Sequence, residues 1–344
     1  ENIEASQRHV DEHLPNYIAQ ATMEAQEQGV AINADSKTQP TVIHGAEGFD
    51  VSASAEAIPE AERVAITKED LQFPETFNEG EALISLVCNV KDIRSEADGE
   101  LGTLYPEQAA DFRESIRQRM EGLYSRLSPE EREKLDVVVL AGDTPLVTPG
   151  EDGLLVDQQR AVLTGKEIIQ AVRESMEANG VDPNEHITAD EDNPIAITHL
   201  RDVNMLHQTD KPNVKQFVDY LIEKYGAGRE LWMAYEDDTE KELRESLEVE
   251  GPSEIAERMS QLVNLSGYIA NIHQQRDPSR RVVVFAVGHY DNISPWAKRT
   301  LMGINPSEGF IPVEKGGGLV IRKSVDGSAE TVVGGKQYPV KIEA

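Results

Sequence analysis

Two residues of this chain have the side chains and the surroundings that a phosphate-binding pocket needs. His289 follows an apolar run at residues 282–287 that predicts a buried β-strand, and Arg160 stands near the start of a helical pattern at residues 158–178. A guanidinium group can make two charge-assisted hydrogen bonds to an oxyanion, and an imidazole can transfer a proton. The pair therefore indicates a phosphate site between the end of a strand and the start of a helix.

The strand that would supply an attacking group lies at residues 83–87 and is followed by Cys88 and Asn89. The nitrogen of a side-chain amide has no available lone pair, so Asn89 cannot form a covalent phosphoenzyme. The sequence therefore predicts a phosphate-site scaffold that lacks a nucleophile at the expected position.

Alternating strand and helix patterns position these residues from residue 83 onward. Strands are predicted at 83–87, 136–141, 195–198 and 282–287, and helices at 107–127, 158–178, 213–226 (N-capped by Asn213) and 253–272 (N-capped by Ser253). Short strands at 319–323, 331–333 and 338–342 predict a meander at the sheet edge. The alternation predicts an α/β fold, a three-layer α/β/α sandwich with a mostly parallel central sheet. Because ligands bind at the carboxyl ends of such strands, Asn89, Gly142 and His289 are expected at one site.

Residues 1–80 differ in composition from the rest of the chain. A helical pattern covers residues 6–29, and the stretch at 31–80 is rich in Ala, Glu, Thr, Ser and Pro. We expect an acidic, partly helical N-terminal extension at 1–80 and a main domain at 81–344. Within that domain, the acidic segment at 147–156 is expected to form a loop over the pocket.

Further short motifs follow one another along the main domain. They are residues 102–109 (Gly-Thr-Leu-Tyr-Pro-Glu-Gln-Ala), 140–145 (Leu-Ala-Gly-Asp-Thr-Pro), 160–164 (Arg-Ala-Val-Leu-Thr) and 287–289 (Val-Gly-His). Over residues 83–344 their order resembles that of the histidine phosphatase superfamily, which has the phosphoglycerate-mutase-like fold. In that family the first strand ends in Arg-His-Gly, its histidine attacks phosphorus, and an acidic residue donates a proton.

The resemblance implies a role for each candidate residue. Arg160 and His289 match the arginine and the late histidine of the family. Cys88 and Asn89 stand at the positions of the first arginine and the nucleophilic histidine, and Asp202 stands where the acidic donor is expected. The resemblance therefore implies a catalytically impaired member. Such a protein would retain a partial phosphate-binding cleft around Arg160, His289 and the two substituted positions, and would act as a binding or interaction module.

The alternative is an active phosphomonoester hydrolase with a substituted nucleophile. Cys88, Arg94 and Ser95 fit the Cys-x5-Arg-Ser pattern of cysteine phosphatases. However, the loop lacks the glycines that let backbone amides converge on phosphate, and Asp92 would repel the anion. His44 also follows an apolar triplet, but no arginine precedes it.

Each candidate also has an ordinary structural explanation. Cys88 fits a small buried hydrophobe, Arg160 a helix-surface arginine, and His289 a core histidine beside a strand. Asp202 fits an acidic residue of a surface loop. These explanations stay open at the level of sequence.

Charge and composition narrow the range of partners. The chain carries 63 acidic and 33 basic side chains, for a net charge of −30, and 5% aromatic residues. Such a charge repels nucleic acid, and so few aromatic residues offer little surface on which bases could stack. A phosphate site must therefore be a local basic pocket, and we expect a phosphorylated small molecule or a protein partner rather than nucleic acid.

Cofactors, metals and membranes are not expected from the motifs. His199 and His207 lack the neighbouring cysteines or carboxylates that a zinc site needs, and no nucleotide-binding motif is present. The single cysteine, Cys88, excludes an intrachain disulfide and favours a cytoplasmic location. No apolar run approaches the roughly 18 residues of a membrane span. Because the chain starts at Glu1 rather than Met, removal of a leader or an anchor also stays open.

Overall fold

The computed structural model describes most of the chain from residue 65 onward. The described residues are 65–91, 103–142, 146–149, 155–158, 160–189, 192–197, 212–226, 229–303 and 311–343. They belong to one compact unit, Val42–Ala344. Several features discussed from the sequence lie outside the described residues, namely the helix at 6–29, His44, residues 92–95, His199, Asp202 and His207.

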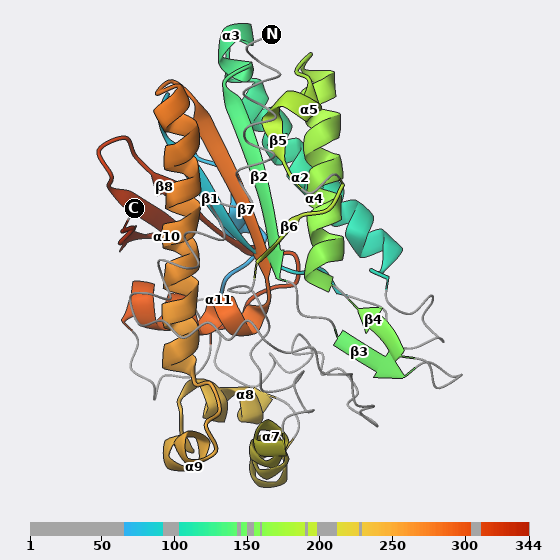
Figure 1. Cartoon of the computed structure of the whole chain (residues 1–344), viewed down its shortest axis with the longest axis vertical. Helices are drawn as coiled ribbons and strands as arrows, with labels where there is room; N and C mark the ends of the chain where they lie inside the picture. Colours follow the sequence, from blue (N-terminus) through green and yellow to red (C-terminus); the bar gives the residue numbers. More distant parts are fainter. Residues whose placement is uncertain are drawn as a thin grey trace. The chain divides into compact units, whose positions relative to one another are not determined.

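A central sheet of eight described strands forms the middle layer (Figure 1). The strands are β1 (Ala82–Cys88), β2 (Leu135–Gly142), β5 (Ile187–Thr188), β6 (Ile195–Ile197), β7 (Arg281–Gly288), β8 (Gly318–Lys323), β9 (Ala329–Val333) and β10 (Lys336–Val340). Their order is β10-β9-β8-β1-β7-β2-β5, and β6 also pairs with β2. β7 thus lies between β1 and β2, where its continuous apolar sequence is covered on both faces.

The sheet is mixed, so the prediction of a mostly parallel sheet is wrong. β1, β7, β2, β5 and β6 pair in parallel. By contrast, β8, β9 and β10 form an antiparallel meander that is joined to β1. Short turns at residues 324–328 and 334–335 connect the meander strands. Parallel neighbours need a crossover of a dozen or more residues, so connections this short dictate antiparallel pairing.

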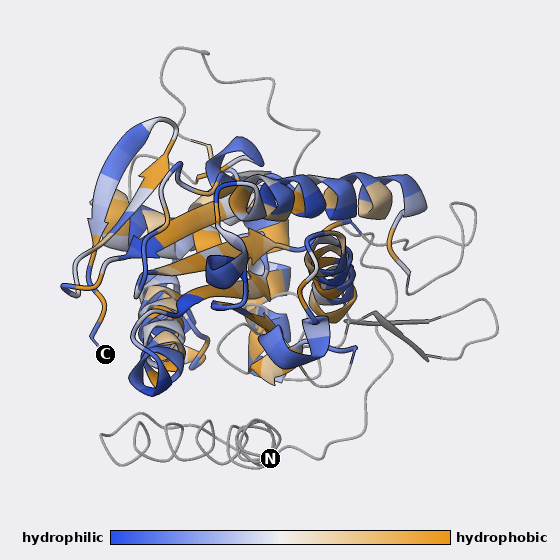
Figure 2. Ribbon diagram, turned by 90° about the horizontal axis from the view of Figure 1, so that it is seen from above, coloured by the Kyte–Doolittle hydropathy of each residue, from blue (hydrophilic) through white to orange (hydrophobic). Residues whose placement is uncertain are grey.

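Helices cover both faces of the sheet. α2 (Pro106–Tyr124) packs on α4 (Arg160–Ala178), which packs on β2 and β7, and α10 (Pro252–Arg276) packs on β1 and β7 from the other face (Figure 1). Every residue of β1, β2 and β7 is buried, and successive side chains point to opposite faces of the sheet. The apolar stripe of α2 enters one of the two cores with Phe112, Ile116 and Met120. Figure 2 shows hydrophobic strands enclosed by helices with hydrophilic outer surfaces.

The segment before α4 forms a hairpin, where the sequence predicted an acidic loop. β3 (Leu146–Pro149) and β4 (Leu155–Gln158) pair in antiparallel register. The apolar pairs at the start of each strand, separated in the sequence by an acidic segment that contains glycine, satisfy the pattern of a hairpin. Because β4 extends to Gln158, α4 begins at Arg160 rather than at residue 158.

Two predicted helix caps are also wrong. α10 begins at Pro252 with Gly251 as its N-cap, and the Gly251 amide donates to the Glu254 carboxylate at 3.1 Å. Proline is well suited to the first helical position because the amide it lacks would have no helical partner there. Asn213 lies inside α7 (Pro212–Tyr225), and its Nδ2 donates to the Leu247 carbonyl at 2.7 Å.

Residues 65–80 pack against the main domain. Ile66 forms a bridge with Val313 and is fully buried. The short helix η2 (Glu69–Leu71) and Phe77 also contribute to the core, through Leu71 and the phenyl ring. The boundary between extension and main domain at residue 80 stays a prediction.

A group of helices, inserted between β6 and α10, forms its own core. It comprises α7, α8 (Arg229–Glu236) and α9 (Lys241–Ser246). Phe217, Leu221, Trp232 and Tyr235 are buried together there, and Tyr290 of the main domain packs on them. The inserted helices are therefore joined to the element that follows β7, which is α11 (Tyr290–Trp296).

A buried polar seam strengthens this junction. Lys298 is fully buried in η4 (Ala297–Met302), and its Nζ lies 2.6 Å from Oδ1 of Asp237. Arg299 donates to the backbone carbonyl of Glu236 at 2.8 Å. Burial raises the pKa of the Glu236 carboxyl to about 8, although the charges of Lys298 and Arg299 oppose the rise.

A second buried charge cluster joins three elements at the amino end of β2. Oδ1 of Asp136 lies 2.5 Å from Nη1 of Arg280 and 3.1 Å from Nδ1 of His186, and its Oδ2 lies 2.8 Å from Nδ1 of His273. His186 belongs to α5 (Pro183–His186) and His273 to α10. Burial would raise the pKa of Asp136, but the two histidine hydrogen bonds and nearby positive charges hold it well below its usual range.

The Glu236→Gln variant should change the pH dependence of stability. The wild-type carboxyl has a folded-state pKa of about 8, above its ordinary value of 4.5, so the native protein retains a proton that the unfolded chain loses. Its contribution is fully present below about pH 4.5 and is lost as the pH rises through about 8. Because glutamine does not ionise, the variant should lose less stability than wild type between about pH 5 and about pH 9 in thermal denaturation. Identical pH profiles would contradict a buried carboxyl.

The Asp136→Asn variant should be strongly destabilised. It removes the negative charge that His186, His273 and Arg280 share, and breaking a buried charge cluster costs about 3–5 kcal/mol. Chemical denaturation near neutral pH measures this loss. Asp326→Asn, in the exposed turn between β8 and β9, is the matched control and should change stability by less than about 0.5 kcal/mol. Comparable losses in the two variants would show that the cluster has no special role.

Candidate functional site

The ends of β1 and β7 place Asn89 beside His289. The strands are parallel neighbours, with Cys88 in register with Gly288. The Asn89 amide donates to the Gly288 carbonyl at 2.9 Å. Asn89 and His289 therefore leave adjacent strands at the same level of the sheet.

The start of α4 is held against the same sheet edge. Thr164 Oγ1 accepts a hydrogen bond from the Val90 amide at 3.0 Å. Arg160 lies one helical turn before Thr164, and residues four apart occupy the same face of a helix. Both side chains are buried. The motif at residues 160–164 therefore lies next to the end of β1, and Thr164 makes the hydrogen bond that joins the two elements.

The segment before β8 closes the edge from the other side. Cys88 donates its amide to the Gly317 carbonyl at 2.8 Å. The Gly316 amide lies 3.1 Å from the Cys88 carbonyl and 3.3 Å from the Asn89 carbonyl. At Gly318 the two backbones approach so closely that a Cβ atom would lie 2.0 Å from the Leu86 carbonyl oxygen. Glycine is therefore required at this point of contact.

These contacts use three consecutive backbone donors. The amide of Cys88 donates to the residue before β8, that of Asn89 to the end of β7, and that of Val90 to a side chain of α4. A cysteine-phosphatase loop needs such amides to converge on the anion. Cys88 is moreover fully buried as the last residue of β1. The geometry at the start of the Cys-x5-Arg-Ser segment therefore disfavours that mechanism.

The Asn89 side chain is engaged with its own backbone. Its Nδ2 donates to the Val90 carbonyl at 2.8 Å, and its buried Oδ1 has no hydrogen-bond partner among the described residues. A buried acceptor without a partner costs roughly 1–3 kcal/mol. The Asn89 side chain thus offers an anion no nucleophile, and one of its two N–H donors is already used within the protein.

His289 is the N-cap residue of α11. Its amide lies 3.3 Å from Oδ1 of Asn292. Tyr290, the next residue, packs edge-on against Trp232 of α8, with ring centroids 5.0 Å apart. The ammonium group of Lys315 lies 5.0 Å from the centroid of the same tyrosine ring.

The structure thus groups most, but not all, of the predicted site residues. Asn89, Arg160 and His289 stand at element ends that share one sheet edge, although they are only 0%, 6% and 3% exposed. Asp202 lies outside the described residues. Lys315 was not singled out from the sequence. The run of three glycines at residues 316–318, which signals a close backbone approach, was the clue to its position.

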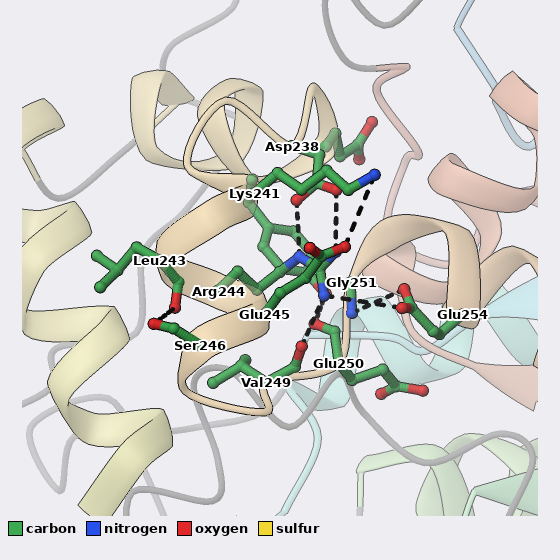
Figure 3. Close-up of polar contacts among 12 residues, drawn as sticks. Asp238, Lys241, Leu243, Arg244, Glu245, Ser246, Val249, Glu250, Gly251 and Glu254 are labelled. Atoms are coloured by element: carbon green, nitrogen blue, oxygen red, sulfur yellow. Dashed lines mark hydrogen bonds and ion pairs between the residues drawn. The ribbon is translucent and has the colours of Figure 1, made fainter.

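A surface hollow of about 470 Å³ lies elsewhere, between α9 and the start of α10 (Figure 3). It is lined by Arg244, Glu245, Glu248, Val249, Glu250 and Glu254. Arg244 is buried and committed to Asp238, at 2.7 and 3.0 Å, and to the Val249 carbonyl at 2.8 Å. The acidic lining makes this hollow unsuitable for a phosphate group.

The described residues show neither a metal-ligand cluster nor a membrane-spanning helix. They contain no group of three or more histidine, cysteine or carboxylate side chains arranged to hold a metal ion. Within the same part of the chain, no helix is long and apolar enough to cross a membrane.

Comparisons with known proteins do not assign this chain to a family. No family model matches the chain, and no curated protein matches it. A solved structure of phosphoglycerate mutase from Bacillus anthracis str. Sterne is similar over 75% of this chain and 95% of its own length, with 12% identity and a TM-score of 0.36. A likeness this weak carries no argument about family. The topology itself establishes a mixed α/β fold with helices around a central sheet.

Proposed function

We propose that this chain is a histidine-phosphatase-like protein that has lost its covalent nucleophile and works as a binding or interaction module. One observation supports the proposal above the others. The hydrogen bond from the Asn89 amide to the Gly288 carbonyl puts the degenerate nucleophile position directly beside His289. In this proposal the side-chain amide of Asn89, which cannot attack phosphorus, stands at the nucleophile position.

The proposed ligand is an oxyanion such as a phosphate monoester, on a small molecule or on a protein. Arg160 supplies a bidentate donor from the start of α4, and His289 supplies an imidazole from the end of β7. Since the amides at residues 88–90 are already hydrogen-bonded within the protein, side chains must provide the anion contacts. Both side chains are buried, so an incoming ligand requires the chain around them to open.

The wild-type protein should show no measurable turnover of p-nitrophenyl phosphate and no acid-labile phosphohistidine. The physical reason is that Asn89 cannot attack phosphorus. The Cys88→Ser variant should behave like wild type. Turnover that Cys88→Ser abolishes would instead establish a cysteine-based hydrolase, and turnover that survives both Cys88→Ser and His289→Gln would refute the assigned chemistry.

The double change Cys88→Arg, Asn89→His should raise the affinity for tungstate, a phosphate analogue, by about 10- to 100-fold. The new arginine would add charge-assisted hydrogen bonds of roughly 1.5–3 kcal/mol each. Hydrolysis should return less readily, because an attacking imidazole must also be oriented by a neighbouring acceptor. Calorimetry measures the affinity.

Both substituted positions are fully buried, so thermal denaturation must first show that the double variant is folded. Adding Arg160→Gln should remove the gain in affinity. Arg173→Gln, farther along the same helix and partly exposed, is the matched control and should preserve it. A folded double variant without any gain would mean that the oxyanion site has been lost together with its nucleophile.

A further inference from the structure

The proposed oxyanion site has fewer positive charges than binding of a phosphate in negative surroundings needs. Cys88 replaces an arginine, and the protein as a whole carries a net charge of −30. Asp291, two residues after His289, is only 4% exposed and adds negative charge at the same edge. Two phosphate charges facing Arg160 alone would therefore be incompletely compensated.

The backbone of Lys315 lies next to the substituted positions. The amide of the following residue, Gly316, lies within hydrogen-bonding distance of the carbonyls of both Cys88 and Asn89, at 3.1 and 3.3 Å. Lys315 is therefore the neighbour of a residue that contacts Cys88, the position at which the proposed family has an arginine. The two positions are more than 200 residues apart in sequence.

The side chain of Lys315 reaches the aromatic ring of Tyr290, the residue that follows His289. Its Nζ lies 5.0 Å from the centroid of the Tyr290 ring. Trp232 holds that ring edge-on, at an interplanar angle of 81°. An ammonium group over an aromatic face is stabilised by the negative potential of the ring, and its four-carbon stem lets it move toward a stronger anion.

Another lysine, Lys298, is held by a carboxylate. Lys298 follows α11, but its Nζ is fully buried and lies 2.6 Å from Asp237. Lys315 is half-buried and belongs to the segment that contacts the end of β1.

We propose that Lys315 supplies the cationic charge lost at Cys88, and that it binds the phosphate oxyanion together with Arg160 and His289. This inference rests on the proposed function. Lysine contributes a compact point charge in place of the fork of an arginine, which suits charge neutralisation more than bidentate orientation. The residue would therefore favour binding of the anion without restoring the geometry for attack.

Tungstate binding to the full-length protein, measured by calorimetry, tests the assignment. Lys315→Gln should weaken binding by about tenfold or more, and Lys315→Arg should retain most of it. Lys336→Gln is a matched control, because the Lys336 ammonium also lies over a tyrosine ring, that of Tyr338, at 5.1 Å but in β10. That variant should bind within about twofold of wild type, since an exposed distant charge is screened by salt.

The possible outcomes separate this inference from the proposed function. If Arg160→Gln weakens binding and Lys315→Gln does not, the oxyanion site stands and Lys315 is not part of it. Equal losses in Lys315→Gln and Lys336→Gln would reduce the effect to general electrostatics and overturn the assignment. Absence of tungstate binding by the wild-type protein would overturn both.

Chemical labelling gives a readout on the wild-type chain that does not depend on the folding of a variant. Saturating tungstate should slow acetylation of Lys315, measured by mass spectrometry, several-fold relative to Lys336. Equal protection of the two lysines would contradict the proposal. In the Cys88→Arg, Asn89→His background, Lys315→Gln should have a smaller effect than in wild type, because the new arginine would take over its charge.

Discussion

Three consecutive backbone hydrogen bonds at the end of β1 hold this fold together at its central edge. The amides of Cys88, Asn89 and Val90 donate to the loop before β8, the end of β7 and the Thr164 side chain of α4. Each buried amide needs a partner, and here each partner comes from a different part of the chain. The antiparallel meander, the central parallel strand and the helix that carries Arg160 therefore share one anchor. The glycines at residues 316–318 allow the backbone approach that this anchor requires.

The same hydrogen bonds limit the chemistry of the site. Backbone amides that are bonded within the fold cannot also cradle a phosphate, so the anion recognition that we propose must come from side chains. Arg160 and His289 are brought to the edge by α4 and β7, and Lys315 is brought there by the segment before β8. In the proposed function, the amide of Asn89 at the nucleophile position favours binding over bond cleavage.

Ionisable groups stabilise the scaffold away from this edge. Asp136 connects β2 to α5 and α10 at the opposite end of the strand, and its pKa is lowered by two histidine hydrogen bonds. Glu236 sits in the junction between α8 and η4, where burial raises its pKa. Asp136 stabilises the folded protein at pH values above the acidic range. The contribution of Glu236 to folding stability is lost as the pH rises through about 8. Through these two groups, folding stability should decline both when the medium becomes strongly acidic and when the pH rises through about 8.

The sequence alone determined the main elements, because buried strands and amphipathic helices leave periodic patterns that need no knowledge of their neighbours. Residues 83–87, 136–141 and 282–287 form strands as predicted, and Arg160 stands at a helix start. Only the tertiary structure decided the mixed sheet, the β3–β4 hairpin and the placement of Lys315 beside Cys88. Strand direction and the approach of Gly318 to Leu86 depend on contacts between segments far apart in the chain. Such contacts impose no local period on the sequence, so pairing and long-range approach become visible only when the chain is folded.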